Sequence, residues 1–416
     1  MWNPHSDGSL QIWNHEITTY LSKSCDVLVY SGLFGFKSDE SVEGVRYSRF
    51  STRWDERFLK HFRSIREILG INGPLFKSDL WYPGYCLKVA LDLRRQACDI
   101  VHVHYYPQFA SLIKQLNPTL RVVLHMHGEW LTQVKFNKLS SRLCQLDLVV
   151  SCSEFITKSI VTKFPQIASR CRTVPMGVSA DFASLGYQNR HADDSSSGRL
   201  LCVGRISPEK GIHVLLDAFE LIIRESPDAT LTIVGPEWVA PREDITDLSL
   251  DKDTIAGLAP FYRDSYLGQL KRKLSPEAAK KVTFVGLVAH SDVPAFYQKA
   301  DIYIGPSLYE SFGASIIEAM TAGVPVVATR VGAVPELISE GKSGLVVDSN
   351  NPSAIADAVI KLLGNNELRN SISFAARDLV YKQFSWDTIC AALIQTYREV
   401  LNRRTVDLNY AESATE

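Results

Sequence analysis

Six short apolar segments alternate with helical patterns through the second half of the chain. They lie at residues 200–203, 230–234, 282–285, 301–304, 324–328 and 344–347. Strands that are apolar along their whole length, with helices between them, are typical of a parallel sheet that is covered on both faces. The sequence therefore predicts an α/β domain with a doubly wound sheet, in which ligands bind beyond the carboxyl ends of the strands.

Two turns that follow these predicted strands carry charged residues beside glycines. The turn after the first strand holds Arg205 and Lys210. The planar guanidinium of arginine can donate several hydrogen bonds to a phosphate, and the ammonium of lysine binds it as a point charge. The turn after the fourth strand holds Glu310, and Glu318 follows inside the next helix. A helix N-terminus attracts anions, whereas carboxylates accept hydrogen bonds from hydroxyls. Either turn alone would more often be a solvated loop, but together they favour a phosphate linked to sugars, such as a nucleotide sugar.

The first half of the chain contains two predicted strands that end in His-x-His. The pairs are His102 with His104 and His125 with His127, and strand alternation places each pair on one face. Two such pairs raise the alternative of a metal centre. No cluster of acidic residues follows at ligand-like positions, and histidines at strand ends are often only hydrogen-bonded. We therefore expect no metal.

A basic amphipathic helix is predicted over residues 53–69. Its apolar face would carry Trp54, Phe58, Phe62, Ile65 and Leu69, and arginines and lysines occupy the rest. Two interpretations stay open. The helix packs on its own domain with a solvated basic face, or it contacts a membrane surface or an anionic acceptor.

Composition excludes several classes of protein. The formal net charge of −1 gives no general attraction to nucleic acid or membranes. No apolar run reaches the roughly 20 residues that span a bilayer. The eight cysteines are scattered without a Cys-x-x-Cys pair, as in a reducing compartment. We expect a cytoplasmic protein without a nucleic-acid partner, at most peripheral at the inner membrane face.

Three motifs together resemble the retaining glycosyltransferases of family 4, the group 1 glycosyl transferases with the GT-B fold. They are Gly204-Arg205 with Glu209-Lys210-Gly211, Glu310-Ser-Phe-Gly with Glu318, and Gly332-Ala-Val-Pro-Glu336. The resemblance covers essentially the whole chain. It implies two Rossmann-like, doubly wound domains that face across a cleft, with a C-terminal helix that crosses back to the first. With the polar linker at 191–198, we predict domains at 1–190 and 198–385, then a crossover helix and tail at 386–416.

The resemblance also implies an activity and roles for single residues. The activity is hexosyl transfer with retention from a UDP- or GDP-sugar to a hydroxyl acceptor, saccharide or lipid-linked, without a metal or other cofactor. Such transfer serves polysaccharide, glycolipid or glycoside biosynthesis. Arg205 and Lys210 would hold the donor diphosphate, Glu318 the ribose, and Glu310 the donor sugar near the reacting carbon. The leaving phosphate would itself accept the proton of the acceptor.

Further positions follow from the same resemblance. His127 matches a cleft histidine near the donor sugar, with His125 as the second choice, and Glu129 and Trp130 would line the acceptor side. Gly286 would lie near the base. Backbone N–H groups would cap the phosphates and sugar, at Phe312, Gly313, Ala314 and Ser315.

The start of the chain departs from the family pattern of a strand followed by a glycine-rich turn. A helical pattern begins at Gln11, and Gly8 would be what is left of the turn near the donor phosphates. We therefore expect the first sheet to lack its first strand. Other functions on this fold are a nucleotide-sugar epimerase, a sugar-phosphate synthase, or a non-catalytic subunit.

Overall fold

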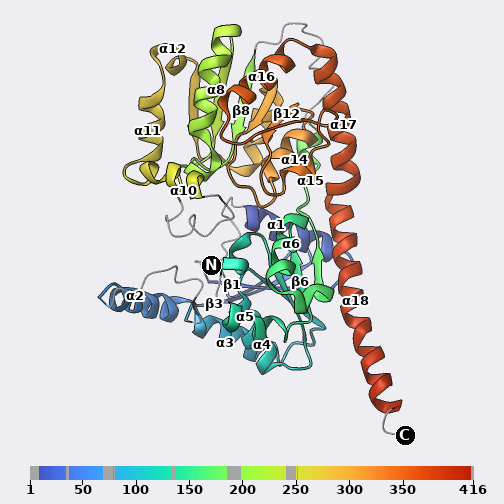
Figure 1. The fold of residues 1–416 in the computed structure, drawn as a ribbon. Coiled ribbons are helices and arrows are strands. Elements are labelled where there is room, and N and C mark those ends of the chain that lie inside the picture. Colours follow the sequence, from blue (N-terminus) through green and yellow to red (C-terminus); the bar gives the residue numbers. More distant parts are fainter. Residues whose placement is uncertain are drawn as a thin grey trace. The chain divides into compact units, whose positions relative to one another are not determined.

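The computed structural model describes residues 9–33, 37–68, 78, 80–133, 136–184, 198–239, 250 and 252–413 (Figure 1). The chain divides into two compact units. One comprises Met1–Pro175 with Trp386–Glu416, and the other comprises Met176–Ser385. We call them unit 1 and unit 2. Of the linker predicted at 191–198, only Gly198 belongs to the described residues.

Unit 2 contains a six-stranded sheet in the order β10-β9-β8-β11-β12-β13, and all of its strand pairs are parallel. Each strand lies within two residues of a predicted apolar segment. The bounds are β8 Arg199–Val203, β9 Thr230–Val234, β10 Val282–Gly286, β11 Ile302–Gly305, β12 Val326–Thr329 and β13 Leu345–Val347. The predicted parallel α/β sheet is confirmed.

Helices connect these strands and bury apolar stripes against the sheet. The longest are α8 Ile212–Glu225, α16 Pro352–Leu363 and α17 Asn366–Phe384. A shorter helix, α14 Ala314–Thr321, lies between β11 and β12 in the chain. Helix α8 packs on α16, and α14 packs on α17. The shorter helices are α7 Asp181–Ser184, α10 Lys252–Leu258, α11 Tyr266–Lys273, α12 Pro276–Ala279, α13 Pro294–Lys299 and α15 Val334–Leu337.

Unit 1 contains two sheets. Strands β4 Ile100–His104, β5 Arg121–Met126, β6 Leu148–Ser151 and β7 Cys171–Thr173 are parallel in that order. The second sheet has the order β1-β3-β2, with β1 Val27–Gly32, β2 Asp39–Val42 and β3 Val45–Phe50. Strand β2 is polar and mostly exposed, so no apolar pattern in the sequence indicates it. That strand pairs antiparallel with β3 through a turn at Glu43 and Gly44, whose φ angles are 51° and 80°.

The helices of unit 1 include both ends of the described chain. They are α1 Ser9–Leu21, α2 Arg53–Ile68, α3 Pro83–Asp92, α4 Pro107–Leu116, α5 Phe136–Leu143, α6 Glu154–Lys163 and α18 Trp386–Ser413. Helix α18 packs against α1, as the resemblance implies for a helix returning to the first domain. Helix α18 continues to Ser413, within the segment predicted as crossover helix and tail. Gly8 lies outside the described residues.

None of the helices described is both long and apolar enough to cross a lipid bilayer.

Candidate functional site

The loop after β8 holds Arg205 between a carboxylate and an aromatic ring. An Nη2 atom of Arg205 donates to Glu209 at 3.2 Å, and Ser207 donates to the same buried carboxylate. On the other side, the guanidinium carbon lies 4.6 Å from the centre of the Trp238 ring. Arg205 is nevertheless 41% exposed, so it is oriented by its neighbours and still accessible to an anion.

Lys210 reaches from the same loop to the loop after β11. Its Nζ lies 2.7 Å from Oε2 of Glu310, and Ser307 donates to that oxygen at 3.2 Å. Lys210 is 22% exposed and Glu310 is 16% exposed. The structure thus brings together the two charged residues to which the family resemblance gives roles at the diphosphate and the sugar.

Two glycines let these loops approach one another more closely than any other residue would. A Cβ on Gly211 would lie 2.0 Å from the carbonyl oxygen of Pro306, and a Cβ on Gly332 would lie 1.9 Å from that of Glu310. Both glycines have positive φ angles, 66° and 50°. Ala333 N–H also donates to the Glu310 carbonyl at 3.0 Å. Glycines of the first and third motifs therefore hold the Glu310 loop backbone to backbone.

Helix α14 begins directly after this loop. Gly313 is its N-cap and has a φ of 109°. The amide groups of the first turn, which include Ala314 and Ser315, have no acceptor inside the helix and point towards its start. Phe312 is buried, and its ring packs edge-on against Phe384 with centres 5.9 Å apart. The predicted phosphate-capping segment is therefore the start of α14.

Glu318 projects from α14 and is oriented by two residues that the sequence analysis did not find. Tyr297 donates to Oε2 at 2.9 Å, and His290 Nε2 lies 3.4 Å from Oε1. Burial, reinforced by Glu318, raises the pKa of Tyr297 well above its ordinary value, so this hydroxyl stays a donor. Tyr297 falls within the apolar pattern of α13, and nothing in that pattern distinguishes it from a core residue.

Gly286 ends β10 at the same edge of the sheet. Its carbonyl accepts a bond from Gly235 N–H at 2.9 Å. Gly235 in turn lies so close to Gly204 that a Cβ would come 2.0 Å from the Gly204 carbonyl oxygen. Because β10, β9 and β8 are neighbours, Gly286 lies two strands from the loop of Arg205. Apart from its two chain neighbours, no described residue comes within 4 Å of the position that a Cβ of Gly286 would take.

His127 belongs to unit 1, where it follows β5. Its Nε2 lies 3.0 Å from Nδ1 of His104, its ring stacks on His125 at 4.1 Å, and its Nδ1 is buried without a hydrogen-bond partner. Burial lowers the pKa of His127 well below its ordinary value, so it is neutral near pH 7. Glu129 and Trp130, predicted on the acceptor side, are buried, and Ser159 donates to Glu129 at 3.3 Å.

Two α/β units with parallel sheets, and charged loops at the strand ends of the second, define a GT-B protein. Two family models match in tandem. The model of the group 1 glycosyl transferases matches residues 187–379, and the model of glycosyltransferase family 4 matches residues 14–182. The chain belongs to the group 1, family 4 glycosyltransferases, and several of its relatives are named as glycosyltransferases.

The relatives match this chain over different shares of its length. Spore coat protein SA of Bacillus subtilis is 25% identical over 408 residues, which cover 94% of this chain and 95% of that protein. A GDP-mannose-dependent alpha-(1-6)-phosphatidylinositol monomannoside mannosyltransferase of Mycobacterium tuberculosis is 32% identical over 208 residues, 48% of this chain and 47% of that protein. The Anabaena protein HepE, solved in complex with UDP-glucose, is 18% identical with a TM-score of 0.65, covering 96% of this chain and 98% of that one.

Proposed function

We propose that this chain is a retaining hexosyltransferase that uses a UDP- or GDP-sugar donor and a hydroxyl acceptor. The observation that carries the proposal is the contact between Lys210 and Glu310 beside the start of α14. A phosphate-binding cation and a hydroxyl-binding carboxylate then meet at one anion-attracting helix terminus, as a sugar joined to a diphosphate requires. Related proteins are named for GDP-mannose or solved with UDP-glucose, which supports either base.

Catalysis in this site rests on position and charge. Arg205 and Lys210 stabilise the charge that develops on the leaving diphosphate, together with the amide groups at the start of α14. Glu310 holds the sugar hydroxyls so that the reacting carbon faces the acceptor. The leaving phosphate oxygen takes the proton of the acceptor hydroxyl as that hydroxyl forms the new bond on the same face of the sugar.

Two side-chain truncations test the donor site. We expect Lys210→Ala and Glu310→Ala each to reduce release of the nucleoside diphosphate by about a hundredfold or more, because each removes charge or position from the reacting groups. Lys342→Ala, an exposed lysine of the same unit, is the matched control and should keep wild-type turnover. Wild-type turnover by either folded site variant would overturn the assignment. Turnover should also survive excess chelator, since the side chains of Arg205 and Lys210 supply the positive charge at the leaving diphosphate.

The base is identified by thermal shift with UDP-, GDP- and ADP-sugars. A donor at about a hundred times its dissociation constant should stabilise the protein by about 2.7 kcal/mol. The shift should be confined to one class of base and should be lost in Arg205→Ala. A folded wild-type protein that responds to none of these donors would favour the non-catalytic alternative.

We also propose a peripheral contact of α2 with anionic lipid or a lipid-linked acceptor. The helix is attached through Asp55 and Leu59, which are buried, and the Asp55 carboxylate accepts from Gly84 N–H at 2.7 Å. Trp54 is 59% exposed and stacks on Phe58, with ring centres 5.4 Å apart. The aromatic face predicted from the sequence is therefore only partly buried. Exposed basic residues flank it, namely Arg53, Arg57 and Lys60.

Co-sedimentation with vesicles that contain phosphatidylglycerol tests this contact. We expect Trp54→Ala to weaken binding several-fold and high salt to reduce it, because aromatic burial and charge both contribute. Phe374→Ala is the control, since Phe374 is 73% exposed on α17 of the other unit. Equal binding by Trp54→Ala and wild type, or none by wild type, would refute the proposal.

A further inference from the structure

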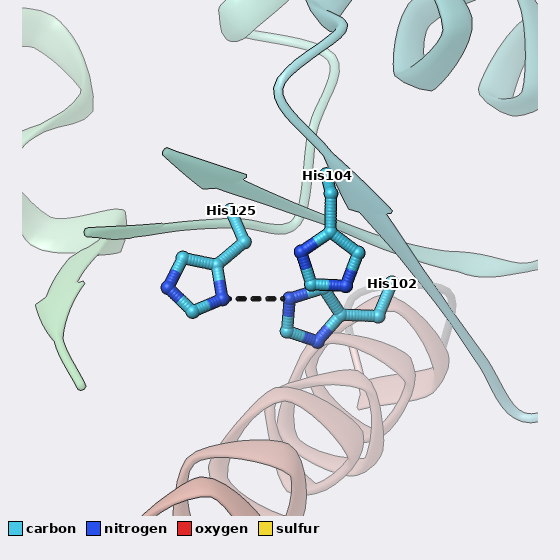
Figure 2. A group of neighbouring side chains, drawn as sticks. All are labelled: His102, His104 and His125. Atoms are coloured by element: carbon cyan, nitrogen blue, oxygen red, sulfur yellow. Dashed lines mark hydrogen bonds between the residues drawn. The ribbon is translucent and has the colours of Figure 1, made fainter. Parts of the chain in front are cut away.

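Three histidines of unit 1 converge beneath helices α1 and α18. His102 and His104 come from β4 and His125 from β5, where His104 and His125 are paired in register. Figure 2 shows the three rings facing one another. One nitrogen from each ring can be chosen so that all three atoms lie within 4.8 Å of one another. Strand alternation in the sequence places the histidines of each strand on one face, as two separate pairs. The parallel pairing of β4 with β5 then brings the imidazoles of both strands together.

Among the described residues, hydrogen bonds link two rings of this cluster to each other and one ring to α18. His125 Nδ1 lies 3.1 Å from His102 Nε2, and Tyr397 on α18 lies 2.5 Å from His102 Nδ1. His125 is 0% exposed, and its Nε2 is buried with no hydrogen-bond partner. Because Nδ1 of His125 faces His102, this atom, and not the unpartnered Nε2, can share a metal ion with His102.

We propose that His102, His104 and His125 bind one divalent first-row transition metal ion of the Zn²⁺ class. Ligands at 2.0–2.1 Å from a tetrahedral metal lie roughly 3.3 Å from each other. The 3.1 Å between Nδ1 of His125 and Nε2 of His102 is already close to that spacing. Since all three ligand atoms lie within 4.8 Å of one another, no pair of them must approach by more than about 1.5 Å. Imidazole nitrogen is a ligand that zinc and its neighbours prefer, whereas magnesium and calcium prefer oxygen.

Surrounding residues are placed to orient these ligands. Tyr397 holds Nδ1 of His102, and His127 Nε2 lies 3.0 Å from Nδ1 of His104, which leaves Nε2 of both rings for the metal. Such outer contacts set the tautomer and direction of ligating imidazoles. The Trp13 ring of α1 packs over the rings, 4.9 Å from His125 and 5.1 Å from His104 between centres. The metal would join β4 to β5 under this cover.

The cluster also offers a route by which an ion can enter. His102 and His104 are partly exposed, which gives the ion a route of entry. A solvent molecule would complete a four-coordinate site, as in other three-histidine centres.

The first test is metal binding by the full-length chain. The purified protein is stripped with chelator, dialysed against zinc sulfate, passed over a desalting column and analysed for metal and melting temperature. We expect about one equivalent of zinc per chain and a rise in melting temperature of about 2–4 °C. Stripped protein loaded with Co²⁺ should show the intense visible absorption of a four-coordinate ion. Folded wild-type protein that retains no zinc, or binds Co²⁺ only with the pale spectrum of the aquated ion, overturns the proposal.

Variants then locate the site. His102→Gln and His125→Gln should each lose the bound equivalent, and Tyr397→Phe should weaken affinity about 10–100-fold through the lost outer contact. His213→Gln is the matched control, since His213 of unit 2 is also bonded to a tyrosine hydroxyl at 2.8 Å. Retention of the full equivalent by a doubly substituted His102→Gln, His125→Gln protein would overturn the assignment. If these variants do not fold, the wild-type Co²⁺ spectrum decides.

Discussion

Replacing Gly332 by alanine should disable the donor site from a position that carries no functional group. The new Cβ would lie 1.9 Å from the Glu310 carbonyl oxygen, about 1.5 Å inside an ordinary contact of roughly 3.4 Å. The position of the Cβ is fixed by its own backbone and the carbonyl belongs to the Glu310 backbone, so no side-chain rotation relieves the clash and the Glu310 loop must move. A misplacement of about 1 Å can cost about a hundredfold in rate, and we expect kcat/KM to fall by at least that factor.

The assay is release of nucleoside diphosphate with the donor class identified by thermal shift. Alanine at a φ of 50° also adds about 1–2 kcal/mol of backbone strain, which lowers the melting temperature independently of the site. Gly341→Ala separates the two effects, because Gly341 has a φ of 72° and its Cβ would meet no described residue within 4 Å other than its chain neighbours. It should lose stability and keep turnover. Wild-type turnover by folded Gly332→Ala, or an equal loss in Gly341→Ala, would refute the reasoning.

Three further outcomes follow from other contacts. Tyr297→Phe should weaken donor binding about tenfold, measured by calorimetry, because Glu318 loses the hydroxyl that orients it; unchanged affinity would show that Glu318 needs no such support. Burial lowers the pKa of His213 to about 4, so its contribution to stability is present above about pH 6.5 and is lost as the pH falls towards 4. Denaturant titrations should show a shallower acid dependence in His213→Gln, and identical slopes would contradict this. Trp238→Ala should weaken binding of the nucleoside diphosphate a few-fold by releasing Arg205, whereas tighter binding would show that the ring obstructs the site.

The arrangement of unit 2 could be predicted from the sequence because local pattern and burial agree there. Its strands are apolar along their whole length, so their positions appear directly in the sequence. Strand β2 was missed because Asp39–Val42 is polar and mostly exposed, and its turn at Glu43 lacks the usual Asn-Gly or Asp-Gly signal.

The candidate site could be predicted only where its residues lie in recognisable turns. Arg205, Lys210 and Glu310 were found because each follows a strand beside glycines. The ion pair of Lys210 with Glu310 joins residues a hundred positions apart, so it depends on how two loops approach in space. The close approach of Gly332 to the Glu310 carbonyl depends on the same kind of contact between loops. Trp238 lay in a segment for which the sequence suggested no function. The histidine cluster depends on the register between β4 and β5, which neither strand reveals alone.

The ion pair of Lys210 with Glu310 bears on how substrate and product compete for the protein. In this site each cation faces a carboxylate, Arg205 with Glu209 and Lys210 with Glu310. Under the proposed assignment, a bare diphosphate that draws Lys210 away leaves the 16% exposed Glu310 without a cation. With an intact donor, the hydroxyls of the sugar donate hydrogen bonds to the Glu310 carboxylate and replace the contact with Lys210. Cleavage of the sugar removes this exchange, so the same contact that recognises the donor also favours departure of the spent nucleotide and limits product inhibition.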